Sequence, residues 1–543
     1  MKLVTTLLLC GAMAAGVFAG CGGRGVKVTG ETLQIGVVAR GFGSEHVKQL
    51  AKAFKEKTGI DAQVVRSTPD DNFVYSSLQM GPGKNEVDLY VTGHINNFKL
   101  LAKKGTIVKG YDPIWADLSE VYESTPEGFV ETKADPTLKM KQLIPAETYK
   151  AVTWTDGNQY AVPYTMGVSG LLYNKTLWDQ TNQSLLNNGK SAMSLPKTSK
   201  QLFEVFETIT NLRNPAKTPS SYLIDAYAFN FSGQATYGHM MFSPWWAQYD
   251  GKGLIYNFME GKDADGNYTP EIFKSTGRLR ALENMKNLYT EGYFDPNDTA
   301  KDFTKAQLDF LRGRAFFSLN GDWLENEASE NFKGEADVAF LPIPLISDIV
   351  EKFPADFPGG KTPGNEAKLR LIVDYLDGAA GAADQGISAD TLNFLREARK
   401  FKYHDQSENL LMHVPAYSKH IDKAKAFLKY MYSKEGQEVM MSSCYGNMCP
   451  LKVDPKQFDY YNGGEITVMG KSKIDIFQDA NLFGSDNLST PLMYLTSFTG
   501  WRLNGTSFSG AFMQGISPAE LQQVEYKYYL DTWTELMKAI GQA

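Results

Sequence analysis

The architecture of this chain can be inferred first from LQIGVVARGFGSEHVKQLAKAFKEKTGIDAQVV, which spans residues 33–65. Its first six residues are mostly apolar and include β-branched side chains, which is typical of a strand. After Ser44, a candidate N-cap, apolar side chains recur over 47–54 with the i, i+3, i+4, i+7 spacing of one helical face. Two further strand-like runs follow at 62–65 and 87–91. Strands that alternate with helix in this way predict an α/β unit with a parallel sheet.

Similar local signals continue along the rest of the 543 residues, a length that predicts two to four domains. A hairpin around Asp-Gly is predicted at 153–160, and capping-box residues open helices at Thr198 and at Ser517. The apolar spacing at 424–431 predicts another amphipathic helix. Between about 346 and 405, Pro-Gly-Gly and Ala-Gly-Ala segments predict an insertion of loops and helices.

The first 21 residues carry the pattern of a secretory signal. A positive charge precedes an apolar run that is too short to span a membrane permanently. Small residues then precede Cys21, which resembles a bacterial lipobox, although Phe18 stands where Leu or Val is usual. We therefore expect residues 1–20 to be removed, Cys21 to be acylated, and the Gly-rich residues 21–30 to form a flexible tether. An ordinary secretory cleavage, which leaves Cys21 as a free thiol, is the alternative.

The predicted location is the cell membrane, with the lipid-anchored chain facing away from the cytoplasm. Elsewhere no apolar run reaches the roughly 18 residues typical of a spanning helix, so the chain is not expected to be a channel or permease. The formal net charge is −7 and no Lys/Arg cluster is present, which argues against a nucleic-acid partner. Aromatic residues make up 12% of the chain, and Tyr and Trp offer flat apolar faces with a polar handle, which suit sugar rings.

The sequence carries no recognisable metal-binding or nucleophile motif. Its six histidines form no HExxH or other close pair, and no GxSxG elbow is present. No metal or cofactor is therefore expected, whereas a carboxylate pair for glycoside hydrolysis stays open because only the fold brings such acids together. Cys444 and Cys449 bracket Tyr-Gly-Asn-Met, and either a short disulfide or two reduced, half-buried thiols fits this spacing.

Six blocks of sequence carry a family resemblance. The most specific is Tyr160-Ala-Val-Pro-Tyr164 followed by Gly170-Leu-Leu-Tyr-Asn-Lys175. Another runs from Phe310 through Asn320-Gly-Asp-Trp323, and the others are 54–60, 195–198, 424–437 and 515–520. In this order they resemble the extracellular solute-binding proteins of ABC transporters, in the family that includes maltose-binding protein. They extend from about Leu33 to the C-terminus and leave out 346–405.

The resemblance implies an α/β, two-lobe periplasmic-binding-protein-like fold of type II, with hinge crossings between the lobes. The first lobe is expected at 31–164 plus 413–462, and the second at 165–412 plus 463–543. The chain is expected to cross back near Leu411–Pro415, because hinge motions are absorbed by a few residues at the ends of strands. The ligand would enter between the lobes, which close around it and bury most of its surface.

The resemblance also indicates where ligand-binding residues should lie. It places Trp323 against a sugar face, and Asp322 beside it could bind a pair of hydroxyls. Trp245 and Trp246 lie where relatives bring aromatic residues to the cleft, and because they are adjacent we expect one of the two to be core. Loops that follow strands supply further candidates, since ligands bind at the carboxyl ends of strands in such sheets. The remaining candidates are Trp501 and Arg502 from the second lobe and Arg40, Glu45, His94 and Tyr164 from the first.

The leading interpretation is a monomeric binding protein and not an enzyme. In view of the aromatic content it would capture a carbohydrate, with an oligosaccharide as the expected ligand, and deliver it to the permease subunits of an ABC importer. The same fold binding a peptide, polyamine or organic anion is one alternative. A sensor that binds without import and an extracellular glycan-acting enzyme are two others, and the sequence leaves the identity and length of the sugar open.

Overall fold

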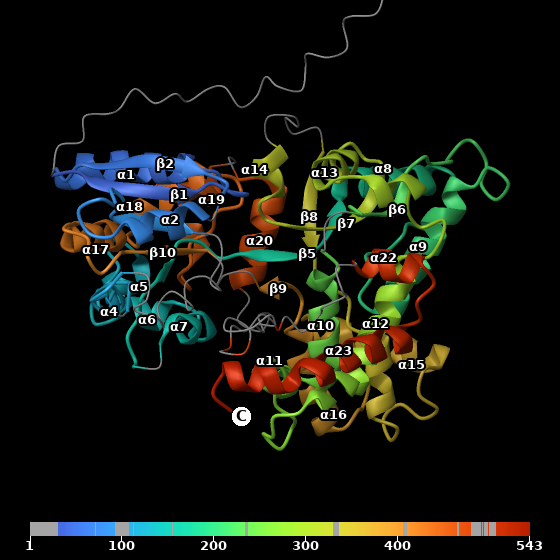
Figure 1. The fold of residues 1–543 in the computed structure, drawn as a ribbon. Helices are drawn as coiled ribbons and strands as arrows, with labels where there is room; N and C mark the ends of the chain where they lie inside the picture. The colour runs from blue at the N-terminus through green and yellow to red at the C-terminus, as the bar shows by residue number, and fades with distance from the viewer. Residues whose placement is uncertain are drawn as a thin grey trace, which may run out of the picture.

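The computed structural model describes residues 31–542 except 71, 93–107, 112, 155, 234–236, 329–335, 406–409, 464–465, 479–489, 491, 493–497 and 499–506. Two β-sheets of five strands each divide the described chain into two lobes that lie side by side (Figure 1). Each sheet is covered by helices, so the mixed α/β class predicted from the sequence is confirmed. None of the described helices combines the length and the apolar character that crossing a membrane requires.

The sheet of the first lobe has the strand order β2-β1-β3-β10-β4. The strand β1 pairs in parallel with both β2 and β3, as the opening sequence predicts. The strand β10 comes from far downstream and pairs antiparallel with β3 and β4. The bounds are β1 Leu33–Val38, β2 Ala62–Thr68, β3 Leu89–Thr92, β4 Val162–Pro163 and β10 Leu411–His413.

The first helix, α1 (Glu45–Thr58), shows how local sequence builds this lobe. Its buried side chains include Val47, Leu50 and Phe54, the predicted apolar face, and Gly59 ends the helix with φ 74°. Ser44 precedes the helix but makes no side-chain capping hydrogen bond, which differs from the prediction. The other α-helices among the described residues of the first lobe are α2 Asn72–Met80, α4 Ser119–Tyr122, α5 Val130–Ala134, α6 Met140–Leu143, α7 Ala146–Val152, α17 Ile421–Met431, α18 Lys434–Ser442 and α19 Asp459–Asn462.

The sheet of the second lobe is organised around β5 (Val168–Asn174), which pairs antiparallel with β7, β8 and β9. The edge strand β6 pairs in parallel with β7. The other bounds are β6 Tyr227–Asn230, β7 Ala315–Gly321, β8 Val338–Leu341 and β9 His404–Asp405. The α-helices of this lobe are α8 Lys175–Asn187, α9 Ser199–Arg213, α10 His239–Asp250, α11 Lys252–Glu260, α12 Thr276–Leu288, α13 Phe303–Leu311, α14 Leu324–Ala328, α15 Pro363–Leu376, α16 Ala389–Arg399, α20 Val468–Gln478, α22 Phe508–Met513 and α23 Pro518–Ala539.

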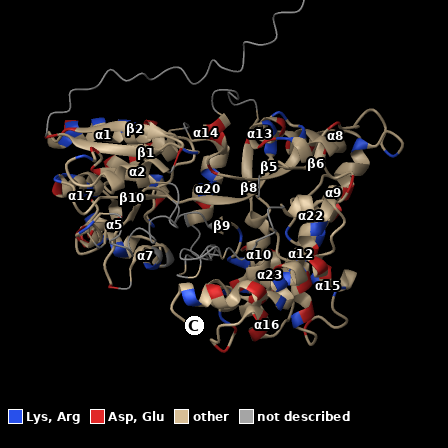
Figure 2. Ribbon diagram, in the orientation of Figure 1, with Lys and Arg blue, Asp and Glu red and all other residues tan. Residues whose placement is uncertain are grey.

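The region 346–405 forms helices, among them α15 and α16. Their side chains Leu369, Ile372 and Leu395 are fully buried in the same hydrophobic core as β7 and α10. This region is therefore an integral layer of the second lobe. Figure 2 shows basic and acidic residues interspersed over the described helices of both lobes.

The described chain passes between the two sheets from β4 to β5, from β9 to β10, and from α19 to α20. The predicted boundary at 412/413 falls inside β10, because this strand belongs to the first sheet from Leu411 onward. The other predicted limits of the lobes stay predictions. In the part of the chain that the structure describes, short segments join the lobes at these crossings, so the contacts near them control how the lobes meet.

Candidate ligand-binding site

Trp323 lies at the junction of the two lobes. It stands between the end of β7 and the start of α14, and its half-buried side chain packs against the core of the first lobe. A Cβ atom added at Gly41, in the loop after β1, would lie 2.9 Å from the Trp323 Cβ. A Cβ added at Gly321 would lie 2.2 Å from the indole ring, so glycine is required where the ring folds back over its own strand. Tyr237 meets the indole edge to face, with ring centroids 6.2 Å apart.

Further contacts join the lobes around Trp323. The side-chain amide of Asn326, on α14, donates a hydrogen bond of 2.5 Å to the Gly41 carbonyl oxygen of the first lobe. The Cys444 thiol lies 3.2 Å from the Phe42 carbonyl oxygen and 3.5 Å from Asn326 Oδ1. Figure 1 shows α14 and α20 on the side of the second lobe that faces the first. The junction therefore combines an aromatic face with amide and carbonyl groups, the residue types that suit a polar ring with apolar faces.

Asp322 does not fit its predicted role as a partner of ligand hydroxyls. It is 1% exposed, forms an ion pair with Lys473 of α20, and accepts a hydrogen bond of 2.9 Å from the Val168 N–H. Burial raises the pKa of the Asp322 carboxyl and lowers the pKa of Lys473, while the attraction between the two charges opposes both shifts. The expectation for Asp322 is corrected: its carboxylate is already occupied inside the protein.

Both tryptophans of α10 are core residues. Trp245 is fully buried and its Nε1 donates to the Pro344 carbonyl oxygen at 3.0 Å. Trp246 is 2% exposed and its Nε1 donates to Asp250 Oδ2 at 2.6 Å. Every residue from Met240 to Tyr249 is buried, so the helix is surrounded by protein on all sides. The expectation that one of the two tryptophans faces the ligand is therefore wrong.

The first-lobe candidates differ in their surroundings. Tyr164 is buried and stacks on His46 with ring centroids 5.7 Å apart, which corrects the prediction that it faces the cleft. Burial also raises the pKa of Tyr164 and lowers the pKa of His46 to about 4. Glu45 is exposed and pairs with Lys48 at 3.3 Å, at the start of α1.

Arg40 is the other exposed candidate of this lobe, and its Nε donates to the Pro69 carbonyl oxygen at 2.8 Å. It precedes Gly41, so its backbone lies beside the Trp323 contact. His94, Trp501, Arg502 and the acylation residue Cys21 lie outside the described residues, so their predicted roles stay predictions.

Cys444 and Cys449 are two separate, buried thiols and are not bridged. Of the two alternatives left open by the sequence, the structure therefore has the reduced form. Burial raises the pKa of each thiol to about 12, which disfavours the reactive thiolate. Cys444 contributes to the lobe junction through its packing.

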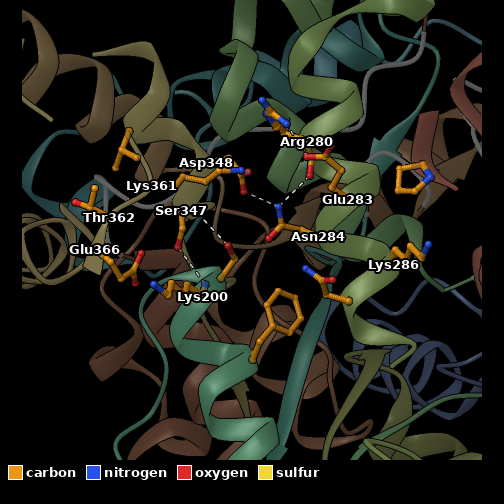
Figure 3. Close-up of a pocket in the computed structure, with 15 residues that line it drawn as sticks. Lys200, Arg280, Glu283, Asn284, Lys286, Ser347, Asp348, Lys361, Thr362 and Glu366 are labelled. Atoms are coloured by element: carbon orange, nitrogen blue, oxygen red, sulfur yellow. Dashed lines mark hydrogen bonds and ion pairs between the residues drawn. The ribbon is translucent and has the colours of Figure 1, made fainter. Parts of the chain in front are cut away.

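Two cavities of about 620 Å³ each lie in the second lobe, away from Trp323. The first lies where α9, α12 and α15 meet, and Figure 3 shows Asn284 bonded to Asp348 and the Lys200 backbone close to Ser347. Asp348 binds Lys361 at 2.8 Å and Asn284 at 2.7 Å, and Arg280 binds Glu283 at 2.8 Å. Several polar groups of this cavity are therefore bonded to one another. Within the described part of the chain, no group of three His, Cys, Asp or Glu residues is arranged to hold a metal ion.

Residues that the sequence analysis missed also lie at the lobe junction, namely Gly41, Tyr237, Asn326 and Lys473. Asn326 follows Trp323 by three residues, so its position on the first turn of α14 could have suggested a role. Lys473 is on a helix far along the chain, and no local pattern connects it to Asp322.

The fold and the junction define a two-lobe binding protein, and comparison with known proteins gives its family. A model of the bacterial extracellular solute-binding protein family matches residues 49–452, so the chain belongs to this family. Proteins of this family bind a solute and serve ABC transporters. A search of curated proteins finds no match.

Solved structures share the fold at low sequence identity. One, from work on xylan utilization by Caldanaerobius polysaccharolyticus, aligns with a TM-score of 0.55 at 15% identity over 92% of this chain and 99% of its own. A putative binding protein MsmE of Bacillus subtilis, in an open conformation, aligns with a TM-score of 0.52 at 15% identity over 93% and 98%. A probable secreted solute-binding lipoprotein of Streptomyces coelicolor aligns with a TM-score of 0.55 at 14% identity over 92% and 98%. The type II two-lobe fold expected from the resemblance is confirmed.

Proposed function

We propose that this protein is the lipid-anchored substrate-binding component of an ABC importer, which captures an oligosaccharide between its lobes and delivers it to membrane permease subunits. The observation that carries the proposal is the position of Trp323. Its indole is half-buried at the lobe junction, whereas Trp245 and Trp246 are fully enclosed in the core. A half-exposed indole offers an apolar face to the C–H groups of a sugar ring.

The binding mechanism follows from the two-lobe geometry. Trp323 and Tyr237 supply aromatic surface from the second lobe, and the loop from Arg40 to Gly43 faces them from the first. A sugar that stacks on the exposed part of the indole, beside the contact between Trp323 and Gly41, touches both lobes, so it favours the arrangement in which the lobes are close together. Such coupling lets a permease distinguish loaded from empty protein by the relative position of the lobes. No bond in the sugar is made or broken.

The N-terminal pattern and the similarity to a secreted solute-binding lipoprotein support the location. We propose that residues 1–20 are a signal peptide, that Cys21 carries the lipid, and that 21–30 tether the two lobes to the membrane. More than one acyl chain is needed for stable anchoring, because each buried methylene contributes only about 0.8 kcal/mol. The tether keeps the binding protein near its permease.

A ligand screen by thermal shift tests the proposal, with xylotetraose, maltotetraose, the corresponding monosaccharides, peptides and polyamines as probes. A sugar that binds with micromolar Kd gains roughly 8 kcal/mol of binding free energy. At a hundredfold excess over Kd it adds about 2.7 kcal/mol to the stability, which raises the melting temperature with a saturating dose dependence. A shift with peptides or polyamines alone would assign the fold to another solute class. Cleavage of the sugar, lost on mutation of one acid, would identify an enzyme.

The Trp323→Ala variant tests the site itself. We expect it to weaken sugar binding by about 2 kcal/mol, or about 30-fold, while the melting temperature without sugar stays close to that of the wild type. Trp533→Ala is the matched control, because Trp533 is also half-buried but lies on α23 of the second lobe. A large loss of stability in Trp323→Ala, with affinity unchanged in the folded fraction, would place Trp323 in the core.

A further inference from the structure

The ion pair between Lys473 and Asp322 involves the residue that immediately precedes Trp323 in the chain. Lys473 and Asp322 are each 1% exposed, so neither charge reaches water. The Lys473 ammonium contacts the Asp322 carboxylate and donates a hydrogen bond to the Gly446 carbonyl oxygen. Gly446 follows α18 of the first lobe, whereas Lys473 and Asp322 belong to the second. One buried ammonium therefore connects both lobes.

The same carboxylate holds the chain where it enters the second lobe. Asp322 accepts a hydrogen bond of 2.9 Å from the Val168 N–H, at the start of β5 and just after the crossing from β4. The backbone is in close contact on the other side as well, since a Cβ atom added at Gly446 would lie 2.0 Å from the Asp322 carbonyl oxygen. Gly446 has φ 83°, so glycine is required there for two reasons. Asp322 is thus fixed by Val168, Lys473 and Gly446.

The charge of Asp322 depends on Lys473. Within the described part of the chain, Asp322 Oδ1 is buried and has no hydrogen-bond partner, so Oδ2 makes the contacts with both Lys473 and Val168. A buried carboxylate that loses its only counter-charge moves toward water or takes up a proton. Because Asp322 is bonded directly to Trp323 in the chain, any such movement changes the position of the indole relative to Gly41.

We propose that Lys473 is a positioning residue of the ligand site: through Asp322 it holds Trp323 at the lobe junction, although Lys473 does not itself touch the ligand. This inference rests on the proposed function in that it assigns Trp323 to the ligand. Asp322 and Trp323 then have different roles: Trp323 contacts the sugar, and Asp322 fixes the loop that carries the Trp323 indole. The ion pair with Lys473 also explains why the residue before Trp323 is charged although its side chain is buried.

The test compares single variants with the double variant Asp322→Asn/Lys473→Met. Lys473→Met alone leaves a buried carboxylate without its counter-charge, and we expect a clear loss of thermal stability. The double variant removes both charges, so we expect its melting temperature to return toward that of the wild type. Its affinity for xylotetraose or maltotetraose, whichever binds the wild type, is expected to stay at least tenfold weaker. The matched control is Arg278→Met/Glu525→Gln, which removes both charges of a fully buried pair elsewhere in the second lobe and should keep wild-type affinity.

Amide hydrogen exchange gives a readout that needs no ligand. In the Asp322→Asn/Lys473→Met variant we expect faster exchange at residues 320–326 and unchanged exchange in α12 and α23. Wild-type exchange at 320–326 together with wild-type affinity would overturn the positioning role and leave the proposed function intact. If neither sugar binds the wild type, the proposed function fails, and the exchange at 320–326 still decides whether Lys473 positions the loop.

Discussion

The buried ion pair between Arg278 of α12 and Glu525 of α23 makes a sharp prediction about stability. Both side chains are fully buried, and Arg278 Nε and Nη2 lie 3.2 and 2.5 Å from Glu525 Oε2. Four aromatic rings surround the guanidinium, with its carbon 4.9–5.5 Å from their centroids, namely Trp246, Phe242, Phe273 and Phe258. The perturbation is Arg278→Met, which keeps an apolar stem of similar length but removes the charge.

The loss of stability expected for Arg278→Met can be worked out from the burial of the ion pair. Removing one partner of a buried pair costs about 3–5 kcal/mol, because the remaining charge is left without compensation. A cation–π contact contributes roughly 0.5–2 kcal/mol. The four contacts share one guanidinium, so their loss is part of this total and is not added to it. For a lobe of this size, about 2–4 °C per kcal/mol gives a fall in melting temperature of about 6–20 °C.

The loss should depend on pH. Burial raises the pKa of Glu525, and the attraction of Arg278 opposes this rise. Without Arg278, the folded-state pKa lies further above the unfolded value of about 4.3, so the folded state binds the extra proton. Stability is then greatest below the unfolded pKa and falls as the pH rises through the folded one. The Arg278→Met penalty should therefore be smaller at pH 5 than at pH 8.

Differential scanning calorimetry at pH 5, 6.5 and 8 measures these effects. The matched variant is Arg278→Met/Glu525→Gln, which removes the residual charge and should recover at least half of the loss at pH 8. The reasoning is refuted if Arg278→Met costs less than about 1 kcal/mol, or if the double variant is no more stable than the single one at pH 8.

Three further predictions concern other parts of the chain. Burial raises the pKa of Glu325 to about 7, so the melting temperature of the wild type should fall between pH 5 and pH 8 as this carboxyl loses its proton. In scanning fluorimetry the melting temperature of Glu325→Gln should change less with pH, and the same pH dependence in both proteins would contradict this. A Cβ at Gly233 would lie 1.9 Å from the Thr299 carbonyl oxygen, so Gly233→Ala should cost about 1–3 kcal/mol by urea unfolding, whereas Gly253→Ala, with open space in α11, should stabilise by roughly 0.5–1 kcal/mol. Cys21→Ser should release the protein from the membrane fraction, and its retention there would rule out the lipid anchor.

The fold was more accessible from the sequence than the site, because local patterns determine local elements. The apolar spacing of α1 and the capping box at Ser517 both have the predicted structure. The helix at 424–431 likewise buries Ala424 and Phe427 as its periodicity indicates. These signals need no knowledge of what the elements pack against.

The site depends on partners that are far apart in the chain. Trp245 and Trp246 share a residue type with Trp323, yet α10 is enclosed on all sides and β7 ends at the lobe junction. No periodicity distinguishes these environments, because burial is decided by the neighbouring elements. Asp322 illustrates the same limit: its spacing beside a tryptophan suggested a ligand contact, and its actual partner, Lys473, lies on α20.

The insertion of β10 between β3 and β4 has a consequence for biogenesis. The first sheet cannot be completed until residues 411–413 are available, although its other strands lie before residue 164. Pairing between segments so distant in sequence slows folding, because a large loop must close before the contacts form. A nascent chain shorter than this leaves β3 and β4 with open edges that invite aggregation. Because residues 411–413 lie about three-quarters of the way along the chain, a polypeptide that crosses a membrane before they are made still has an incomplete first sheet and has not completed this fold.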